Sequence, residues 1–462
     1  MSKLTLIFIA SFLFGIGPCE DESGEVLHSY EHDITSVENS DEDYQLFKNL
    51  IDSYGYQDRV DAVQAIEDNW NASFFAPTIE YMRLITDRRS YKLVNDLLRN
   101  KSKERFTDYY DWLEWLWDND PNYASWFLEY KGDLYKDIDP KFEKYFVGRH
   151  DELNIRADEI VWGGVVQDGI PPLRYPKMIP AVDAAYLEDD HVVFGMYIND
   201  IPRAYPKRIL AWHEFFVDDF LDMTIAGVYC TLCGTVIAYD MEDYSLGTSG
   251  FLYRSNKLMY DQATQSLWNT IEGEPVLGPL AGEDIVLNTY PVVTTTWGEW
   301  KKQHPLTTVL SLDTGHRRNY DEGEAYREYF STDRLMFPVP LADTRLKNKE
   351  EVLVMRVPGY RSDPLAISTT FLKKKKWVDF KVADHNLVAI ADKSGSARAY
   401  DIGDLSIDKV KEDIVIDHQG TSWEVTESAL VNNDGERLER VSAHNIFWFA
   451  WYNAYPDTRL IK

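Results

Sequence analysis

The pattern of apolar and polar residues divides the 462-residue chain into a helical part and a later β-type part. Apolar residues recur at i, i+3 and i+4 in four early segments, namely 44–51, 79–85, 91–98 and 106–117. This spacing places them along one face of a helix. From about Ile160 onward, short runs of β-branched and aromatic residues are separated by turns that contain Gly and Pro. The pattern predicts an α+β fold, with an all-α module at 45–150 followed by a β-rich region.

The N-terminal segment has the features of an export signal. An apolar run from Leu4 to Ile16 precedes Cys19 and is too short to span a membrane comfortably. Residues 20–44 are rich in Asp and Glu and contain no Lys or Arg, a composition that buries too little apolar surface to fold. We expect a signal peptide at 1–19, an acidic linker at 20–44, and an exported protein in the periplasm or at the cell surface. Cys19 is either a lipid attachment site, which would be the only membrane anchor, or a residue beside an ordinary cleavage site.

The β-rich region contains an internal duplication. Four pairs of segments resemble each other in the same order: 193–206 and 352–365, 230–240 and 391–401, 266–268 and 421–423, and 297–307 and 448–458. Such an ordered series indicates a repeated structural unit. We predict two similar β-rich lobes, the first at 155–345 and the second, a degenerate copy, at 346–462.

Chemistry is concentrated in one stretch of the first lobe, Cys230-Thr-Leu-Cys-Gly234. Two thiols at this spacing can share a metal ion, form a disulfide or act as a redox pair. The β-branched and aromatic residues on both sides favour a hairpin knuckle over the start of a helix. Gly234 fits a knuckle, because a positive φ at this residue would let backbone N–H groups point at the sulfur atoms. A knuckle favours a metal site, with redox chemistry and a purely structural turn as alternatives.

Comparison of the two copies adds a third candidate ligand. In a gapless alignment the second copy has neither of the two thiols and lacks His213; Ala391, Ser394 and Lys374 stand at these positions. The three residues are thus absent together, as expected if they form one site that only the first lobe uses. An imidazole about one strand upstream of the knuckle could complete a ligand set.

The identity of the metal depends on the remaining ligand. Two thiolates and one imidazole suit zinc in a tetrahedral site, and they would suit copper as Cu(I) if a soft ligand joined them. Met259 is a weak candidate for that soft ligand. No catalytic residue can be assigned, although Glu214, beside His213, is a weak candidate for a general base. We expect a zinc or copper ion bound by Cys230, Cys233 and His213.

The composition limits the partners. The formal net charge is −29, which argues against nucleic acid because phosphate binding needs clustered Lys and Arg. The helical module contains an aromatic segment at 109–117 with Tyr and Trp on more than one face, which predicts burial between neighbouring helices. A protein partner that binds the helical module is a further hypothesis.

Several motifs together resemble the DUF3179 family of exported bacterial proteins, over about residues 155–462. These motifs are 163–173, 203–206, the knuckle at 229–234, 258–261 with 266–268, and 447–451. Cys230, Cys233 and His213 occupy positions of that family's motif. The family name records an unknown function, so the resemblance implies the domain and export without implying a reaction.

Three functions therefore remain open. The leading hypothesis is an exported protein that binds zinc or copper through the knuckle and His213, for metal delivery or for a metal-dependent reaction. The first alternative is a thiol-disulfide redox protein that uses Cys230 and Cys233. The second alternative is a surface interaction protein in which the knuckle is structural.

Overall fold

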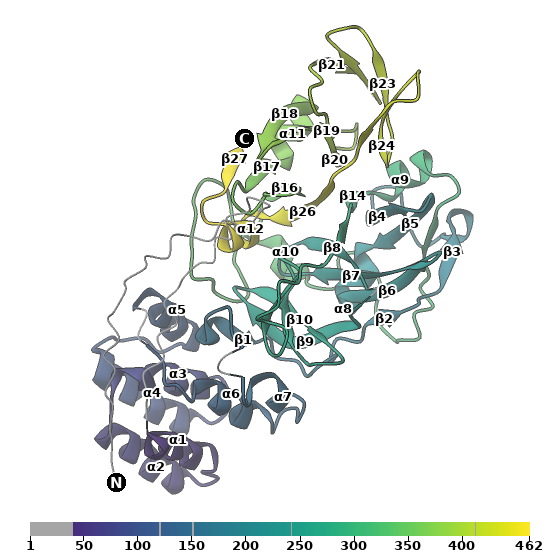
Figure 1. The fold of residues 1–462 in the computed structure, drawn as a ribbon. Coiled ribbons are helices and arrows are strands. Elements are labelled where there is room, and N and C mark those ends of the chain that lie inside the picture. The colour runs from purple at the N-terminus through teal and green to yellow at the C-terminus, as the bar shows by residue number, and fades with distance from the viewer. Residues whose placement is uncertain (1–39, 120–121, 150–151, 242, 412) are drawn as a thin grey trace, which may run out of the picture.

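The computed structural model describes residues 40–462 except 120–121, 150–151, 242 and 412. A helical module, a first β-rich lobe and a second β-rich lobe lie in that order across the molecule (Figure 1). The predicted α+β architecture is confirmed. The predicted signal peptide and most of the predicted linker lie outside the described residues. No described helix is long and apolar enough to cross a membrane.

The helical module begins earlier than its sequence pattern predicts. Its described α-helices are α1 (Asp41–Ile51), α2 (Tyr56–Asp68), α3 (Phe75–Met82), α4 (Arg88–Ser102), α5 (Tyr109–Asn119), α6 (Phe127–Tyr135) and α7 (Glu143–Phe146). Helix α1 starts inside the segment 20–44 that was predicted as a linker. The Ser40 hydroxyl accepts a hydrogen bond from the Asp43 backbone N–H, and acidic residues in a first turn interact favourably with the helix dipole. The end of the acidic segment is therefore helical.

Aromatic residues fill the module and join it to the first lobe. Trp112 and Trp117 are buried, as the pattern of their segment predicts. Phe251 of β9 (Leu246–Tyr253) contacts Phe142 and Phe146 of the module, at ring-centroid distances of 4.8 and 5.1 Å. The module therefore packs directly on the strand that leads into the β9–β10 turn.

The first lobe contains three sheets, with strand orders β14-β4-β5-β15-β3, β13-β8-β7-β6-β2 and β1-β9-β10-β11-β12. The remaining strands are β1 (Ile160–Trp162), β2 (Leu173–Arg174), β3 (Met178–Pro180), β4 (Val192–Ile198), β5 (Ile201–Pro206), β6 (Phe215–Phe220), β7 (Met223–Cys230), β8 (Thr235–Asp240), β10 (Asn256–Asp261), β11 (Leu267–Asn269), β12 (Glu274–Leu277), β13 (Thr289–Tyr290), β14 (Val293–Thr296) and β15 (Thr308–Leu310). Its helices are α8 (Lys207–His213), α9 (Trp297–Gln303) and α10 (Arg327–Ser331).

The second lobe repeats the central part of this topology. Its sheets are β26-β16-β17-β27, β18-β19-β20 and β21-β22-β23-β24-β25. Its elements are β16 (Glu351–Arg356), β17 (Leu365–Ser368), α11 (Thr369–Lys375), β18 (Trp377–Val382), β19 (His385–Ala391), β20 (Ala397–Asp401), β21 (Ile407–Lys411), β22 (Ile414–Asp417), β23 (Ser422–Val425), β24 (Ala429–Asn432), β25 (Arg437–Glu439), β26 (Ser442–Phe447), α12 (Trp448–Ala454) and β27 (Arg459–Ile461). The antiparallel β4–β5 and parallel β5–β15 pairings recur as β16–β17 and β17–β27. The predicted duplication is confirmed.

Shared residues make the same contacts in both lobes. The indole N–H of Trp300 donates to Thr307 Oγ1 at 2.9 Å, and the indole N–H of Trp451 donates to Thr458 Oγ1 at 2.8 Å. Both Trp side chains are fully buried. In each lobe this Trp thus helps to hold its own helix, α9 or α12, against the neighbouring sheet.

The structure shifts the alignment of the two copies by one residue upstream of the knuckle. The backbone N–H of Tyr229 donates to the carbonyl of the residue that caps α8, and the N–H of Ala391 makes the equivalent bond to the cap of α11. Ala391 therefore corresponds to Tyr229. Cys230 corresponds to Asp392, and the gapless alignment, which places Ala391 there, is wrong at this position.

The cause of the shift is the length of the knuckle loop. Residues 231–234 connect the paired strand ends in the first lobe, whereas 393–395 suffice in the second. His213 accordingly corresponds to Lys375, and not to Lys374. The thiols and this His still occur only in the first lobe.

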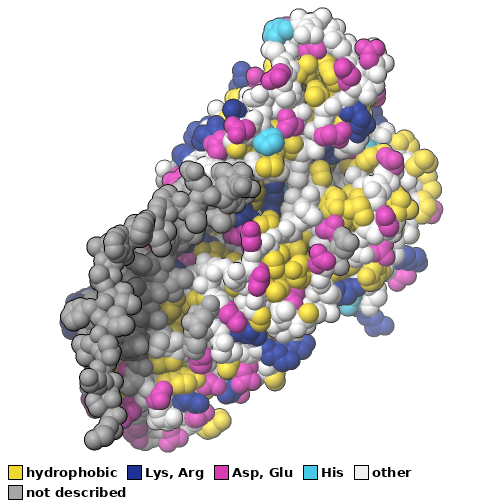
Figure 2. All heavy atoms as spheres, in the orientation of Figure 1, with side chains coloured by type: hydrophobic (Ala, Val, Ile, Leu, Met, Phe, Trp, Pro, Cys, Tyr) yellow, Lys and Arg dark blue, Asp and Glu magenta, His cyan; other side chains and the backbone are white. Residues whose placement is uncertain are grey.

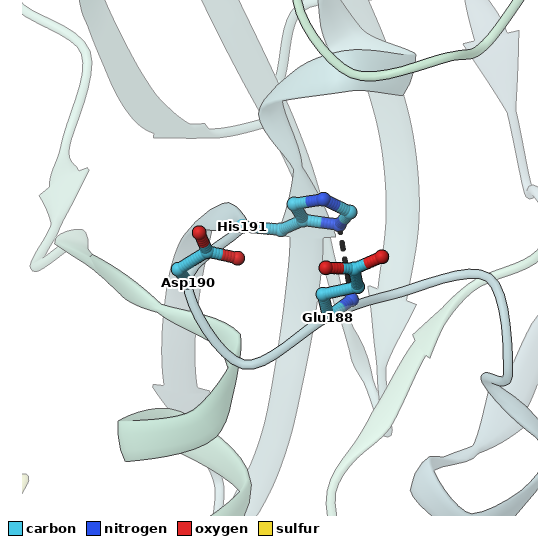
Figure 3. A group of neighbouring side chains, drawn as sticks. All are labelled: Glu188, Asp190 and His191. Atoms are coloured by element: carbon cyan, nitrogen blue, oxygen red, sulfur yellow. Dashed lines mark hydrogen bonds between the residues drawn. The ribbon is translucent and has the colours of Figure 1, made fainter.

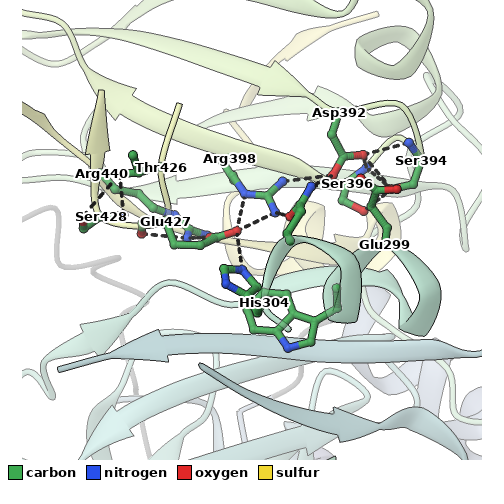
Figure 4. Close-up of polar contacts among 12 residues, drawn as sticks. Glu299, His304, Asp392, Ser394, Ser396, Arg398, Thr426, Glu427, Ser428 and Arg440 are labelled. Atoms are coloured by element: carbon green, nitrogen blue, oxygen red, sulfur yellow. Dashed lines mark hydrogen bonds and ion pairs between the residues drawn. The ribbon is translucent and has the colours of Figure 1, made fainter. Parts of the chain in front are cut away.

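A polar network joins the lobes (Figure 4). Gln303 Oε1, at the end of α9, accepts from Arg398 Nη2 of the second lobe at 2.8 Å. Arg398 also pairs with Asp392 and Glu427, at 3.1 and 2.6 Å. His304 Nε2 lies 3.5 Å from Glu427. Although burial opposes ionisation, Arg398 and a second arginine hold the pKa of Glu427 well below its usual range, so the interface between lobes contains a buried carboxylate paired with cations.

Candidate dithiol site

The two thiols lie at the tip of a β-hairpin, as the sequence predicts. Cys230 ends β7, and its carbonyl accepts from the Cys233 backbone N–H at 3.1 Å. Gly234 has φ of 63°, and its N–H donates to the Thr231 carbonyl at 3.3 Å. The positive φ is confirmed, but these N–H groups bond to carbonyl oxygens instead of pointing at sulfur. The loop is thus closed by ordinary turn hydrogen bonds.

Both thiols are free and buried, and they touch each other. Cys230 and Cys233 are 1% and 0% exposed, and their Sγ atoms lie 2.8 Å apart. The β9–β10 turn covers Cys233: Asn256 Nδ2 donates to its Sγ at 3.1 Å, and the Ser255 carbonyl lies 3.6 Å from it. Cys233 is therefore the inner thiol of the pair.

A buried ion pair lies beside Cys230. Lys257, the next residue of β10, pairs closely with the carboxylate of Glu214. The other Glu214 oxygen accepts from Thr231 Oγ1 at 2.9 Å and from the Tyr326 hydroxyl at 2.8 Å. These groups fix the carboxylate, and through it the ammonium of Lys257. The predicted general-base candidate Glu214 thus lies in the same site as the thiols, and three polar contacts hold its carboxylate.

A cavity of about 100 Å³ adjoins this group. Its polar lining includes Cys230, Thr231, Glu214, Lys257 and Tyr326, and apolar side chains of the lining include Ile170, Leu252, Met336 and Phe337. Cys233 does not line the cavity. Of the two thiols, only the outer one therefore adjoins this cavity.

The surroundings shift the two thiol pKa values in opposite directions. Burial disfavours the thiolate at both residues. At Cys230, the Cys233 thiol, the Lys257 ammonium and a backbone hydrogen bond from Lys257 together outweigh burial and lower the pKa. At Cys233, burial and then the adjacent Cys230 raise the pKa well above its ordinary value. Cys230 is the more acidic thiol, and Cys233 keeps its proton.

His213 is not brought to the thiols. It is buried, and its Nδ1 lies 2.8 Å from the Pro171 carbonyl while its Nε2 lies 2.5 Å from the Tyr320 hydroxyl. Burial lowers its pKa to about 4, so the ring is neutral near pH 7. Because both ring nitrogens already have partners, the predicted role of His213 as a metal ligand has no geometric support in this structure.

Met259 also faces away from the knuckle. It is fully buried in an apolar cluster with Phe215, Val228 and Trp268, whereas both thiols belong to a different cluster that contains the neighbouring Leu258. Successive residues of a strand point to opposite faces. The side chain of Met259 therefore fills the core on the other face of β10.

The structure gathers one group of potential metal donors that sequence reasoning did not single out. Within the described part of the chain, the only three or more His, Cys, Asp and Glu ligand atoms within 4.8 Å of one another are those of Glu188, Asp190 and His191 (Figure 3). The two carboxylates are exposed. His191 Nδ1 accepts from the Glu188 backbone N–H at 3.1 Å and lies 3.3 Å from Arg208 Nη1. Two donors therefore already face this nitrogen.

Sequence reasoning also missed Lys257, Asn256 and Tyr326. The first two follow a turn of the next hairpin, and Tyr326 lies 112 residues beyond Glu214. Lys257 directly precedes the motif at 258–261, which was the one available signal for this part of the site.

These observations define the class of the protein: an α+β chain with a duplicated β-rich region and a buried dithiol in the first copy. Residues 167–458 match the family described as "Protein of unknown function (DUF3179)", and the chain belongs to this family. No curated protein and no solved structure gives a significant match.

Proposed function

We propose that Cys230 and Cys233 carry out thiol-disulfide exchange with a disulfide or dithiol substrate. One observation carries the proposal: two buried thiols with Sγ atoms 2.8 Å apart, of which only the outer one has a cation beside it and adjoins a cavity. Exchange requires an ionised attacking thiol and a second thiol within reach. The opposite pKa shifts fit this division of roles.

The reaction begins at Cys230. Its thiolate attacks one sulfur of the substrate disulfide, the S–S bond breaks, and the other substrate sulfur leaves as a thiolate. Cys233 then attacks Cys230 Sγ, which releases the second substrate sulfur. The protons of the two cysteines end on the two substrate thiols. The pair thus loses two electrons to the substrate, and the reverse sequence reduces it again.

Lys257 and Glu214 have positioning and electrostatic roles in this proposal. The ammonium of Lys257 stabilises the Cys230 thiolate, because an opposite charge nearby favours the ionised form. Glu214 holds that ammonium in place through their ion pair. The carboxylate itself opposes ionisation of Cys230, so its contribution is to the position of Lys257.

Metal binding by the same thiols is the competing proposal, with zinc or copper as the ion. It would need further ligands, because structural zinc sites have four and catalytic sites have three from the protein. Among the described residues, no third His, Cys, Asp or Glu donor atom lies within 4.8 Å of both thiols. The geometry therefore favours exchange, and metal binding stays a prediction.

Export and partner binding also stay proposals. An oxidising compartment would suit a cycling thiol pair. Fractionation of cells that express the whole chain, with a Cys19→Ser variant, tests export and lipid attachment together. If a protein partner binds the helical module, it should bind equally well when the knuckle cysteines are replaced.

Elemental analysis with thiol titration separates the two chemical proposals. We expect the chain from residue 20 onward to show about two titratable thiols when reduced, since it has only Cys230 and Cys233. Both should disappear after a small disulfide is added, and no stoichiometric zinc or copper should be present after growth with both metals. About one metal ion per chain, lost in the Cys230→Ser/Cys233→Ser variant, would instead support the metal site.

A further inference from the structure

A second cavity, of about 260 Å³, lies between the lobes. Tyr229 lines it, whereas Cys230 lines the dithiol cavity. Because consecutive strand residues point to opposite faces, the two cavities lie on opposite sides of β7. The volume is near the lower end of the range of small-molecule pockets.

Structurally equivalent positions of the two lobes face each other in this cavity. Gly234 and Gly395, at the tips of the two knuckle loops, both line it. Thr294 of β14 and Asn445 of β26, which hold equivalent places in their sheets, line it as well. The cavity is therefore formed by equivalent surfaces of the two copies.

The charges in the cavity are not duplicated. Lys207, the first residue of α8, corresponds to Thr369, the first residue of α11, and both line the cavity. Lys373, also in the lining, corresponds to Ala211 by position in the same two helices. Residues shared by the two lobes suffice to build the repeated fold. Charged residues present in only one lobe therefore indicate a function beyond folding.

Lys207 supplies a cation that no close ion pair neutralises in the described part of the chain, although the carboxylates of Glu351 and Glu322 interact with it over a longer distance. It is half-buried, and among the described residues it forms no ion pair; its Nζ lies 3.9 Å from the centre of the Phe330 ring. The lining contains one carboxylate, Glu351, and Glu351 Oε2 already accepts from Asn445 Nδ2 at 3.1 Å. The lining therefore contains two lysines and one carboxylate, which leaves an excess of positive charge.

Hydroxyl groups complete the lining. Tyr229 is fully buried, and its hydroxyl has no hydrogen-bond partner in the described part of the chain. Buried polar groups in native structures almost always have a partner. Seven Thr and Ser residues share the lining: Thr294, Thr295, Thr296, Thr369, Thr370, Ser394 and Ser396. The cavity thus combines cationic and neutral donors.

The second lobe holds part of this lining in place. Asp392 Oδ1 accepts from Ser394 Oγ at 2.6 Å and from the Ser396 backbone N–H at 3.1 Å. Asp392 is tied through Arg398 to Gln303 of the first lobe, in the network of Figure 4. The spacing of the lobes across the cavity is therefore fixed before any ligand binds.

We propose that the cavity between the lobes binds a small oxyanion, a carboxylate or a phosphate, through Lys207, Lys373 and the free hydroxyl of Tyr229. Charge-assisted hydrogen bonds from two ammonium groups would hold the anionic oxygens. The surrounding Thr and Ser hydroxyls would accept or donate to the remaining polar atoms of the ligand. This site is independent of the dithiol chemistry.

Calorimetric titration of the mature chain with inorganic phosphate, citrate and gluconate tests the proposal. We expect saturable binding of at least one probe, weakened about tenfold or more in both Lys207→Met and Lys373→Met, since each removes one charge-assisted contact. Lys375→Met is the matched control, because Lys375 lies on the same helix as Lys373 and is exposed as Lys373 is, but it does not line the cavity. Its affinity should equal that of the parent chain.

The outcomes distinguish a phosphorylated ligand from a carboxylate, and they include results that would overturn the proposal. Binding of phosphate alone would indicate a phosphorylated ligand, and binding of citrate or gluconate alone a carboxylate. No saturable binding of any probe, or equal binding in the Lys207→Met and Lys373→Met variants, would overturn the proposal. Thermal unfolding of each variant verifies that it is folded.

Discussion

At the residue scale, Glu214 has an unusual backbone and an unusual number of partners. Its φ of 56° lies in the left-handed region, where it caps the C-terminus of α8. That conformation costs about 1 kcal/mol or more for a residue with a side chain. The ion pair with Lys257 and the hydrogen bonds from Thr231 and Tyr326 offset this cost. The strained turn is thus maintained by the same contacts that place Lys257 beside Cys230.

The acidity of Cys230 should respond in opposite directions to the two members of this ion pair. Lys257→Met removes the cation that lowers the pKa of Cys230, so the pKa should rise; Glu214→Gln removes the anion that raises it, so the pKa should fall. We expect alkylation by iodoacetamide at pH 7 to slow about tenfold in the first variant, which corresponds to a change of about one pKa unit. The measurement is the alkylation rate as a function of pH.

Two further variants control this experiment. Lys257→Arg keeps the charge and should retain most of the reactivity. Lys257→Met/Glu214→Gln avoids a buried unpaired carboxylate, which by itself destabilises a fold. The same pKa of Cys230 in all four variants would show that the ion pair does not set the acidity of this thiol.

Residue spacing explains which parts of the site the sequence could predict. Cys230 and Cys233 lie three residues apart, and this spacing of two Cys residues by itself indicates thiol or metal chemistry. Lys257 lies 43 residues from its partner Glu214, and no local pattern indicates that β10 returns to the hairpin tip. His213 has the right residue type and the right distance along the chain, but its ring nitrogens bond to other groups. The residue type of His213 therefore could not predict that its side chain points away from the thiols.

At the element scale, the β7–β8 hairpin carries both the thiols and a contact to the second lobe. The Cys233 carbonyl accepts from the Phe447 backbone N–H at 2.8 Å. A Cβ on Gly234 would lie 2.6 Å from the Phe447 ring. Gly234 is therefore needed both for its positive φ and for the close approach of β26.

Gly234→Ala should destabilise the protein more than the same change at a turn with a similar φ but open space. Gly403, with φ of 50° and no atom within 4 Å of an added Cβ, is the matched control. We expect Gly403→Ala to cost about 1 kcal/mol for the positive φ alone. Gly234→Ala should cost about 2–4 kcal/mol, because the clash adds to the backbone strain. Urea unfolding measures both, and equal costs would contradict the proposed packing.

Element types could be predicted better than element ends. The hairpin on each side of the thiols and helices α1, α4 and α5 follow from apolar spacing. The start of α1 did not, because its acidic first turn resembles an unfolded tether until Ser40 is seen to cap it. The one-residue shift in the alignment of the two lobes could not be predicted either. It is visible only in the backbone hydrogen bonds of Tyr229 and Ala391, and the residue types around Ala391 do not indicate it.

At the scale of the whole molecule, one repeated frame has acquired two different sites. The first copy alone carries the dithiol, and both copies together enclose the oxyanion cavity. Acidic side chains are spread over the visible face among Lys and Arg (Figure 2). The positive charge of the cavity is thus local, in a chain whose formal net charge is −29.

Trapping of a mixed disulfide shows which of the two thiols attacks. Cys233→Ser, Cys230→Ser and the parent chain are each incubated with bis(2-hydroxyethyl) disulfide and weighed by intact mass spectrometry. We expect a stable adduct on Cys230 in Cys233→Ser, little adduct in Cys230→Ser, and an internal disulfide without adduct in the parent chain. Equal labelling of the two single variants, or a parent chain that forms no internal disulfide, would rule out thiol-disulfide exchange led by Cys230.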